Sequence, residues 1–268
     1  MNNLTQFTIA VLMLTMPGYC ATWGTWNGAT AGSSAGNISS LDGRTIGTST
    51  GNYGAWNGLV SPGGGGTFSF VQGMAANDCD TATAASVVCT LPGNFSSGNV
   101  LTLGGGLYPG VISSVTDCAG NTWHQGAAQN FQNGLWYAII TAGGCAAVTI
   151  NMSPDSKADF NVLEFTDMGG TPVFDKSSTN TGTSLAPTGT AITPAAANEL
   201  FVSASVVNNG ITQTLNWTGA VDKGFTGGGQ FGQFGLAYKI STGSSAETAA
   251  WTIGSSQGWG VLSIAFKP

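Results

Sequence analysis

The stretch Phe160-Asn-Val-Leu-Glu-Phe-Thr166 decides the fold class of this chain. Leu163 and Phe165 fall on one side of an extended backbone. Val162, Glu164 and Thr166 fall on the other side, so the stretch predicts a strand whose sheet buries one face. Similar runs of apolar and β-branched residues lie between Gly, Asn, Asp, Ser and Pro along the chain. They span residues 67–71, 86–91, 100–103, 111–115, 135–141, 146–152, 199–207, 235–240, 249–253 and 260–266.

Strands in this number, without a convincing helix, predict an all-β domain closed as a two-sheet, jelly-roll-like β-sandwich. The composition agrees, because 42 of the 268 residues are Gly and only 7% are charged, which suits short strands joined by tight turns. The formal net charge is -6, and the six Lys and Arg residues are scattered. A basic surface for phosphates is therefore missing from the sequence, and we expect no nucleic-acid partner.

Residues 1–20 predict a signal peptide. The largely apolar run Phe7–Met16 is too short to span a bilayer, and Pro17-Gly18 interrupts it before an expected cleavage after Cys20. The leading MNNLTQ lacks Lys and Arg, and an apolar N-terminal strand is the alternative. Secretion or display at the cell surface follows from the signal-peptide interpretation.

Residues 21–62 contain three copies of a short motif, each starting fifteen residues after the last. The copies are Trp23–Gly28, Ile38–Gly43 and Tyr53–Gly58, and each ends in Asn-Gly or Asp-Gly. These dipeptides favour tight reversals, so each copy predicts a small β-hairpin. Because three hairpins bury little surface, we expect self-association through residues 21–62 or packing on a partner. A flexible linker is the alternative. The glycines of residues 63–66 then separate the repeats from a β-sandwich domain at 67–268.

Four cysteines remain if the leader is removed, which is an even number without a zinc-ligand spacing. Two disulfides are the simplest interpretation. Four cysteines allow three pairings, of which we favour Cys79 with Cys89 across a short loop and Cys118 with Cys145. Four buried free thiols in a cytosolic protein are the alternative.

Five blocks of the sequence occur in the order seen in a poorly characterised family of bacterial extracellular β-sandwich domains, which residues 67–268 resemble. The blocks are Val111–Trp123, Leu135–Ala138, Val162–Phe165, Ala197–Val202 and Gly258–Phe266. Members of that family usually carry Ser at the position of Cys118, so the second bridge departs from the family pattern. The hairpin repeats resemble short units of phage tail and fibre proteins. Neither resemblance supplies catalytic residues.

Catalytic and metal-binding candidates are few. His124 is the single histidine, and without a nucleophile elbow it reads better as a surface or turn residue than as a triad member. Glu164 is a candidate acid inside an apolar strand, with a hydrogen-bonded structural role as the alternative. Asp78 and Asp80 form a weak calcium candidate, against a solvated turn held by a disulfide. We therefore expect no enzyme and no cofactor other than this calcium site.

Aromatic residues in Gly-rich or turn-like contexts are the remaining candidates for a site. They are Trp123, Trp217, Phe225, Phe231 and Phe234. Exposed rings there offer flat apolar faces to sugars. The sequence thus predicts a non-catalytic extracellular binding or adhesion module for a glycan or cell-surface polymer. A structural protein of a phage tail or fibre, located in the virion, is the alternative, and a hydrolase is a remote one.

Overall fold

The computed structural model describes residues 40–41, 44–45, 66–74, 79–129, 133–207, 214–215, 217–221 and 233–268. The chain divides into two units, Met1–Gly65 and Gly66–Pro268. In the first unit, β1 (Ser40–Leu41) and β2 (Arg44–Thr45) pair antiparallel, which is the pairing expected of the second repeat. The first and third repeats and the predicted signal peptide lie outside the described residues.

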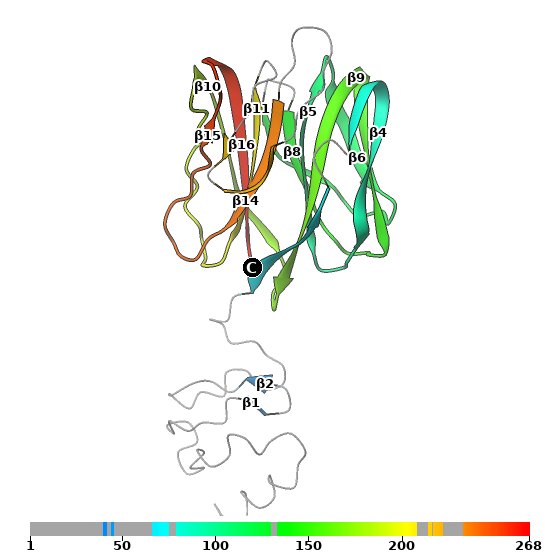
Figure 1. Cartoon of the computed structure of the whole chain (residues 1–268). Helices are drawn as coiled ribbons and strands as arrows, with labels where there is room; N and C mark the ends of the chain where they lie inside the picture. The colour runs from blue at the N-terminus through cyan, green and yellow to red at the C-terminus, as the bar shows by residue number, and fades with distance from the viewer. Residues whose placement is uncertain are drawn as a thin grey trace, which may run out of the picture. The chain divides into compact units, whose positions relative to one another are not determined.

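The second unit is a β-sandwich of antiparallel sheets, which confirms the predicted fold class (Figure 1). The seven-stranded sheet contains β3 (Thr67–Gly73), β4 (Asp80–Phe95), β5 (Val100–Tyr108), β6 (Val111–Asp117), β7 (His124–Gln129), β8 (Asn133–Ile139) and β9 (Cys145–Met168). The five-stranded sheet contains β10 (Val173–Ser184), β11 (Leu200–Val207), β13 (Thr218–Val221), β14 (Gln233–Ile240) and β16 (Gln257–Lys267). A short pair is formed by β12 (Thr214–Leu215) and β15 (Trp251–Thr252). The described part of the chain includes no helix of the length and apolar character that a membrane span needs.

Strand β9 organises the seven-stranded sheet because its 24 residues change partners along their length. Residues 148–153 pair with β6, whereas residues 157–165 pair with β5. On its other edge β9 pairs first with β4 and then with β3. The sheet therefore folds back on itself, with β4 and β6 beside the first half of β9, and β3, β5, β8 and β7 beside the second half (Figure 1).

Three hydrophobic cores result from this layering. Core 1 lies between the two halves of the seven-stranded sheet and includes Leu103, Ile150 and Phe160. Core 2 lies between the two sheets and includes Phe165, Val202 and Leu262. Core 3 lies on the opposite face of the five-stranded sheet, where Phe201 and Val261 pack under Ile192 and Trp251.

The stretch 160–166 is buried on both faces, and the prediction of one buried face is wrong. Phe165 and Leu163 belong to core 2, while Val162 belongs to core 1. The second face is covered because the first half of β9 folds over it together with β4 and β6. Alternation in the sequence identified the strand, but a polar Glu164 suggested a solvated face that does not exist.

Candidate functional site

Three aromatic residues that the sequence suggested for an exposed site are buried. The exposed fractions of Trp123, Trp217 and Phe234 are 9%, 8% and 1%. Their predicted exposure is therefore wrong, and their rings offer no open face to a ligand. Phe225 and Phe231 lie outside the described residues, so their role stays a prediction.

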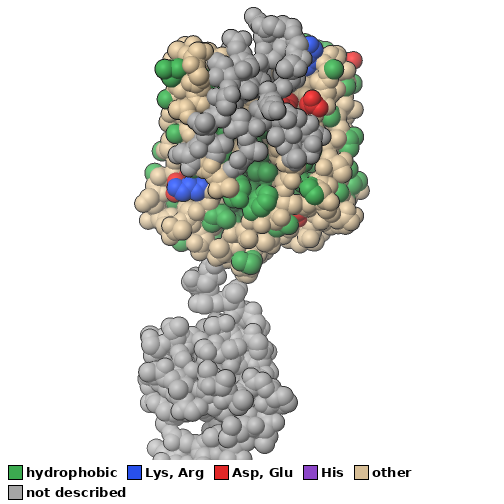
Figure 2. Space-filling view, viewed as in Figure 1, with side chains coloured by type: hydrophobic (Ala, Val, Ile, Leu, Met, Phe, Trp, Pro, Cys, Tyr) green, Lys and Arg blue, Asp and Glu red, His purple; other side chains and the backbone are tan. Residues whose placement is uncertain are grey.

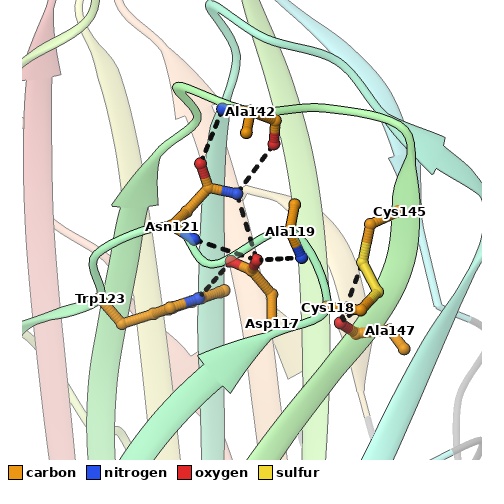
Figure 3. Close-up of a disulfide and its surroundings, with 8 residues drawn as sticks. All are labelled: Asp117, Cys118, Ala119, Asn121, Trp123, Ala142, Cys145 and Ala147. Atoms are coloured by element: carbon orange, nitrogen blue, oxygen red, sulfur yellow. Dashed lines mark hydrogen bonds between the residues drawn. A yellow bond between two sulfur atoms is a disulfide. The ribbon is translucent and has the colours of Figure 1, made fainter.

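Trp123 is fixed by a polar cluster at the turn after β6 (Figure 3). Its Nε1 donates a hydrogen bond to Asp117 Oδ2 at 2.9 Å. The other oxygen, Oδ1, accepts hydrogen bonds from the backbone N–H groups of Ala119 at 2.9 Å and Asn121 at 3.2 Å. The pattern Asp-Cys-Ala-Gly-Asn-Thr-Trp thus forms an Asx-type turn, and its tryptophan has a structural role.

Asn121 attaches this turn to the turn that precedes β9. Its Oδ1 accepts hydrogen bonds from the N–H groups of Thr141 and Ala142, each at 2.9 Å. Its Nδ2 donates to the carbonyl oxygen of Ala142 at 2.9 Å. The disulfide between Cys118 and Cys145 joins the same two segments covalently (Figure 3).

Both predicted disulfides are present. Cys79 pairs with Cys89 at a Cα–Cα distance of 5.1 Å, and Cys118 pairs with Cys145 at 5.8 Å. Two such bridges indicate an oxidising environment. The alternative of four free thiols is therefore wrong.

Phe234 is buried because it lies on β14 of the five-stranded sheet, and Trp217 directly precedes β13 of the same sheet. Phe234 lies opposite Val206 on β11 and packs in core 2. Trp217 packs in core 3, edge-on to Phe201 with ring centroids 6.3 Å apart. Glycine in the sequence indicated a loop, but β14 starts at Gln233, directly before Phe234.

The titratable candidates Glu164 and Asp80 lie on different strands and in different surroundings. Glu164 is fully buried, and its carboxylate accepts hydrogen bonds from Gln72 Nε2, Ser96 N and Asn99 Nδ2 at 2.6, 2.9 and 2.6 Å. It therefore anchors the turn between β4 and β5. Asp80 is exposed on β4, Asp78 lies outside the described residues, and no group of three or more potential metal-ligating side chains occurs in the described part.

An aromatic contact with one exposed ring is found instead where β3 of the seven-stranded sheet meets β14 of the five-stranded sheet. Phe70 on β3 is 42% exposed. Its ring stacks on Tyr238 of β14 with centroids 5.4 Å apart and planes 4° from parallel. Buried Phe165 meets both rings edge-on, at 5.8 and 5.0 Å. We call Phe70, Phe165 and Tyr238 the aromatic edge; Figure 2 shows hydrophobic side chains gathered on the face that carries β14.

Polar groups border the aromatic edge. Exposed Thr218 on β13 lies directly opposite Tyr238 in the sheet, on the same face. Burial raises the pKa of the Tyr238 hydroxyl above its ordinary value, so the group stays a neutral donor at physiological pH. The next residue, Lys239, points to the opposite face of β14 and pairs there with Glu247 at 2.6 Å. In the sequence, Phe70 is the fourth residue after the glycines of residues 63–66, a context that is equally consistent with a core position.

A second stack lies at the other side of the sandwich. Exposed His124 stacks on Tyr137 at 5.3 Å, and Tyr137 stacks on Phe174 at 4.9 Å with planes 7° apart. His124 therefore ends a row of rings that joins β7 and β8 to β10. This position agrees with the interpretation of His124 as a surface residue.

No protein-family model, curated protein or solved structure matches the chain. Both resemblances noted in the sequence therefore stay predictions, and the chemistry of the site is argued from its geometry. A rigid, partly exposed ring with hydroxyls beside it can bind a flat, neutral, hydroxylated ligand through apolar contact and hydrogen bonds.

Proposed function

We propose that this protein is a non-catalytic, extracellular binding or adhesion module that holds a neutral polysaccharide against the aromatic edge. The observation that carries the proposal is the exposed ring of Phe70, fixed by its stacking on Tyr238 and backed by buried Phe165. A ring that is already held in place loses little conformational entropy when a ligand covers it. The two disulfides support an extracellular location, because they persist in oxidising compartments.

Sugar rings suit this surface because each has an apolar face of C–H groups and a polar rim of hydroxyls. Phe70 would cover the apolar face, while Thr218 and the Tyr238 hydroxyl would bond the rim. The residues named for this contact, Phe70, Tyr238 and Thr218, are uncharged at neutral pH, so a neutral polymer fits better than an acidic one. Binding is therefore expected to be weak per site and nearly independent of salt.

The proposal is tested by affinity electrophoresis of the full chain in gels that contain a glucan, a xylan, a mannan or soluble chitin. We expect at least one polymer to retard the protein, and Phe70→Ala to weaken that retardation about tenfold, equal to about 1.4 kcal/mol. Retardation should persist between about 0.05 and 0.5 M NaCl, since few charges are involved.

Val88→Ala is the matched control, because Val88 is 55% exposed on β4, in a different layer of the domain. It should leave retardation unchanged. Unfolding curves of both variants should lie close to wild type, since neither side chain is fully buried. Lack of retardation by every polymer, with self-association through residues 21–62, would replace this proposal by a structural role such as that of a tail or fibre protein.

A further inference from the structure

A small cleft opens on the seven-stranded sheet, at the opposite edge from Phe70. Its volume is about 140 Å³, and it is lined by Leu107, Val111, Ile112, Gln125, Ala128, Gln129 and Gly134. These residues come from the end of β5, the start of β6, and from β7 and β8. In the strand order β3-β9-β5-β8-β7, four inter-strand spacings of about 4.8 Å separate β3 from β7, or roughly 19 Å.

The lining combines apolar walls with neutral amides. Leu107 and Ile112 give the walls their apolar character, and exposed Val111 extends them to the surface. Gln125 and Gln129 each carry a donor and an acceptor, and the described residues that line the cleft include no charged side chain. Such a cleft favours a neutral ligand with both apolar and hydroxyl surface.

The amide of Gln129 is held by the opposite sheet. Its Nε2 donates hydrogen bonds to the carbonyl oxygens of Asn180 at 2.5 Å and Val261 at 3.3 Å. Its Oε1 is buried and accepts no hydrogen bond within the described part of the chain. The two hydrogen bonds from Nε2 therefore hold the Gln129 side chain against the five-stranded sheet.

A donor without a described partner lies beneath the cleft. Trp136 Nε1 is buried and makes no hydrogen bond to a described residue. A Cβ atom at Gly134 would lie 2.8 Å from this nitrogen, so the absence of a side chain at Gly134 leaves the indole N–H next to the cleft. Buried donors and acceptors of this kind are usually satisfied, and a hydroxylated ligand or water would satisfy them.

We infer that the cleft is a second subsite, which accepts one neutral sugar residue of the polymer; this inference rests on the proposed function for the class of ligand. The volume is below the about 300–1,000 Å³ of clefts for drug-sized ligands, and a few times the about 30 Å³ that a water occupies in the liquid. A single ring fits and a longer segment does not. Because the aromatic edge lies at the opposite side of the sheet, one molecule can hold two stretches of polymer at once.

The test follows Trp fluorescence and two-dimensional NMR spectra of the full chain during titration with glucose, galactose, mannose, xylose and N-acetylglucosamine, each as the free sugar. We expect at least one sugar to shift resonances of the cleft residues with saturation. Ala128→Leu fills the cleft from an exposed position and should weaken this binding about tenfold or more. Ala85→Leu, at an exposed position on β4, is the matched control and should leave it unchanged.

Failure of this inference can be told apart from failure of the proposed function. If Phe70→Ala abolishes retardation by a polymer but no free sugar perturbs the cleft, the second subsite is refuted and the proposed function stands. If a sugar saturates the cleft in wild type and Phe70→Ala but not in Ala128→Leu, while no polymer is bound, the cleft stands and the aromatic edge does not. Equal sugar binding by wild type and Ala128→Leu refutes the cleft site.

Discussion

Glu199 is the residue whose buried charge most directly connects the fold to pH. It has no exposed surface, and its Oε1 accepts hydrogen bonds from the N–H groups of Ala195 at 2.6 Å and Ala196 at 2.7 Å. Burial raises the pKa of its carboxyl above the ordinary 4.5, and the nearby Asp175 adds to the increase, while the two N–H groups and Lys176 oppose it. The carboxyl therefore binds a proton more tightly in the folded than in the unfolded chain.

We predict that Glu199→Gln reduces the decrease in the free energy of unfolding that accompanies a rise in pH. In the window from pH 4.5 up to the raised pKa of Glu199, the folded state holds more protons than the unfolded state, so the free energy of unfolding falls as pH rises. Below pH 4.5 the stabilisation that comes from the raised pKa of Glu199 is fully present. Glutamine cannot ionise but still offers an oxygen to both N–H groups. Urea unfolding at several pH values between about 4 and 8 measures the slope.

Glu247→Gln is the control for this prediction, because Glu247 is paired with Lys239 near the surface. It should keep the decline in stability that Glu199 causes. Asp167, whose pKa burial also raises, contributes a decline of the same sign to every variant. Equal slopes in wild type and Glu199→Gln would show that the two backbone N–H groups fully compensate the burial of Glu199.

Exposure of single aromatic residues could not be predicted from the sequence. Trp123 follows a turn and Phe234 lies between glycines, and both contexts indicate a surface position. The burial of Trp123 depends on Asp117, which accepts a hydrogen bond from the indole N–H. The burial of Phe234 depends on its pairing with β11, a strand distant in the sequence. Phe70 lies on the same strand as buried Phe68, and the sequence alone does not distinguish the exposed ring from the buried one.

Among the elements, the two disulfide loops differ in the stability that they provide. The Cys79–Cys89 loop has a sequence separation of 10 and the Cys118–Cys145 loop one of 27. Because a longer loop restricts the unfolded chain more, chain entropy assigns about 2.7 kcal/mol to the first and about 3.5 kcal/mol to the second. The second bridge also joins the two turns that Asn121 connects.

We predict that Cys118→Ser with Cys145→Ser destabilises the domain more than Cys79→Ser with Cys89→Ser does. Equilibrium unfolding of both double variants and wild type measures the difference, which should be about 0.8 kcal/mol. Thiol titration of denatured, unreduced wild type provides the control and should detect none of these four cysteines as free. The reverse order of stability would mean that the unfolded-chain account fails here.

Strand positions were predictable where side chains are apolar, and not elsewhere. The runs 100–103 and 260–266 lie in strands, as does the run 199–207 except for its first residue. By contrast β10 was missed, because Ser177–Ser184 consists of small polar residues and Gly. Side chains of β10 make hydrogen bonds to the segment that follows it. Ser178 Oγ donates to the carbonyl oxygen of Thr190 at 2.9 Å, and Asn180 Nδ2 donates to that of Thr188 at 2.7 Å. The continuity of β9 was also missed, because the apolar pattern lapses around Pro154.

At the scale of the whole molecule, the three cores share their strands. Successive residues of β11 alternate between cores, with Phe201 in core 3 and Val202 in core 2. Strand β16 does the same with Val261 and Leu262. In the seven-stranded sheet β9 contributes Phe160 to core 1 and Phe165 to core 2. A core therefore cannot open alone without exposing residues of strands that a neighbouring core needs.

We predict that a fragment of residues 66–268 folds by itself and unfolds in one cooperative transition. All described residues of its three cores lie within the unit Gly66–Pro268. Because the cores share strands, the loss of one core should disrupt the next. Calorimetry should give equal calorimetric and van't Hoff enthalpies, and the midpoint should match the corresponding transition of the full chain. Two separate transitions would show that the layers unfold independently despite β9 and β16. A fragment that stays unfolded while the full chain folds would place part of a core before residue 66, and would move the domain boundary into the repeats.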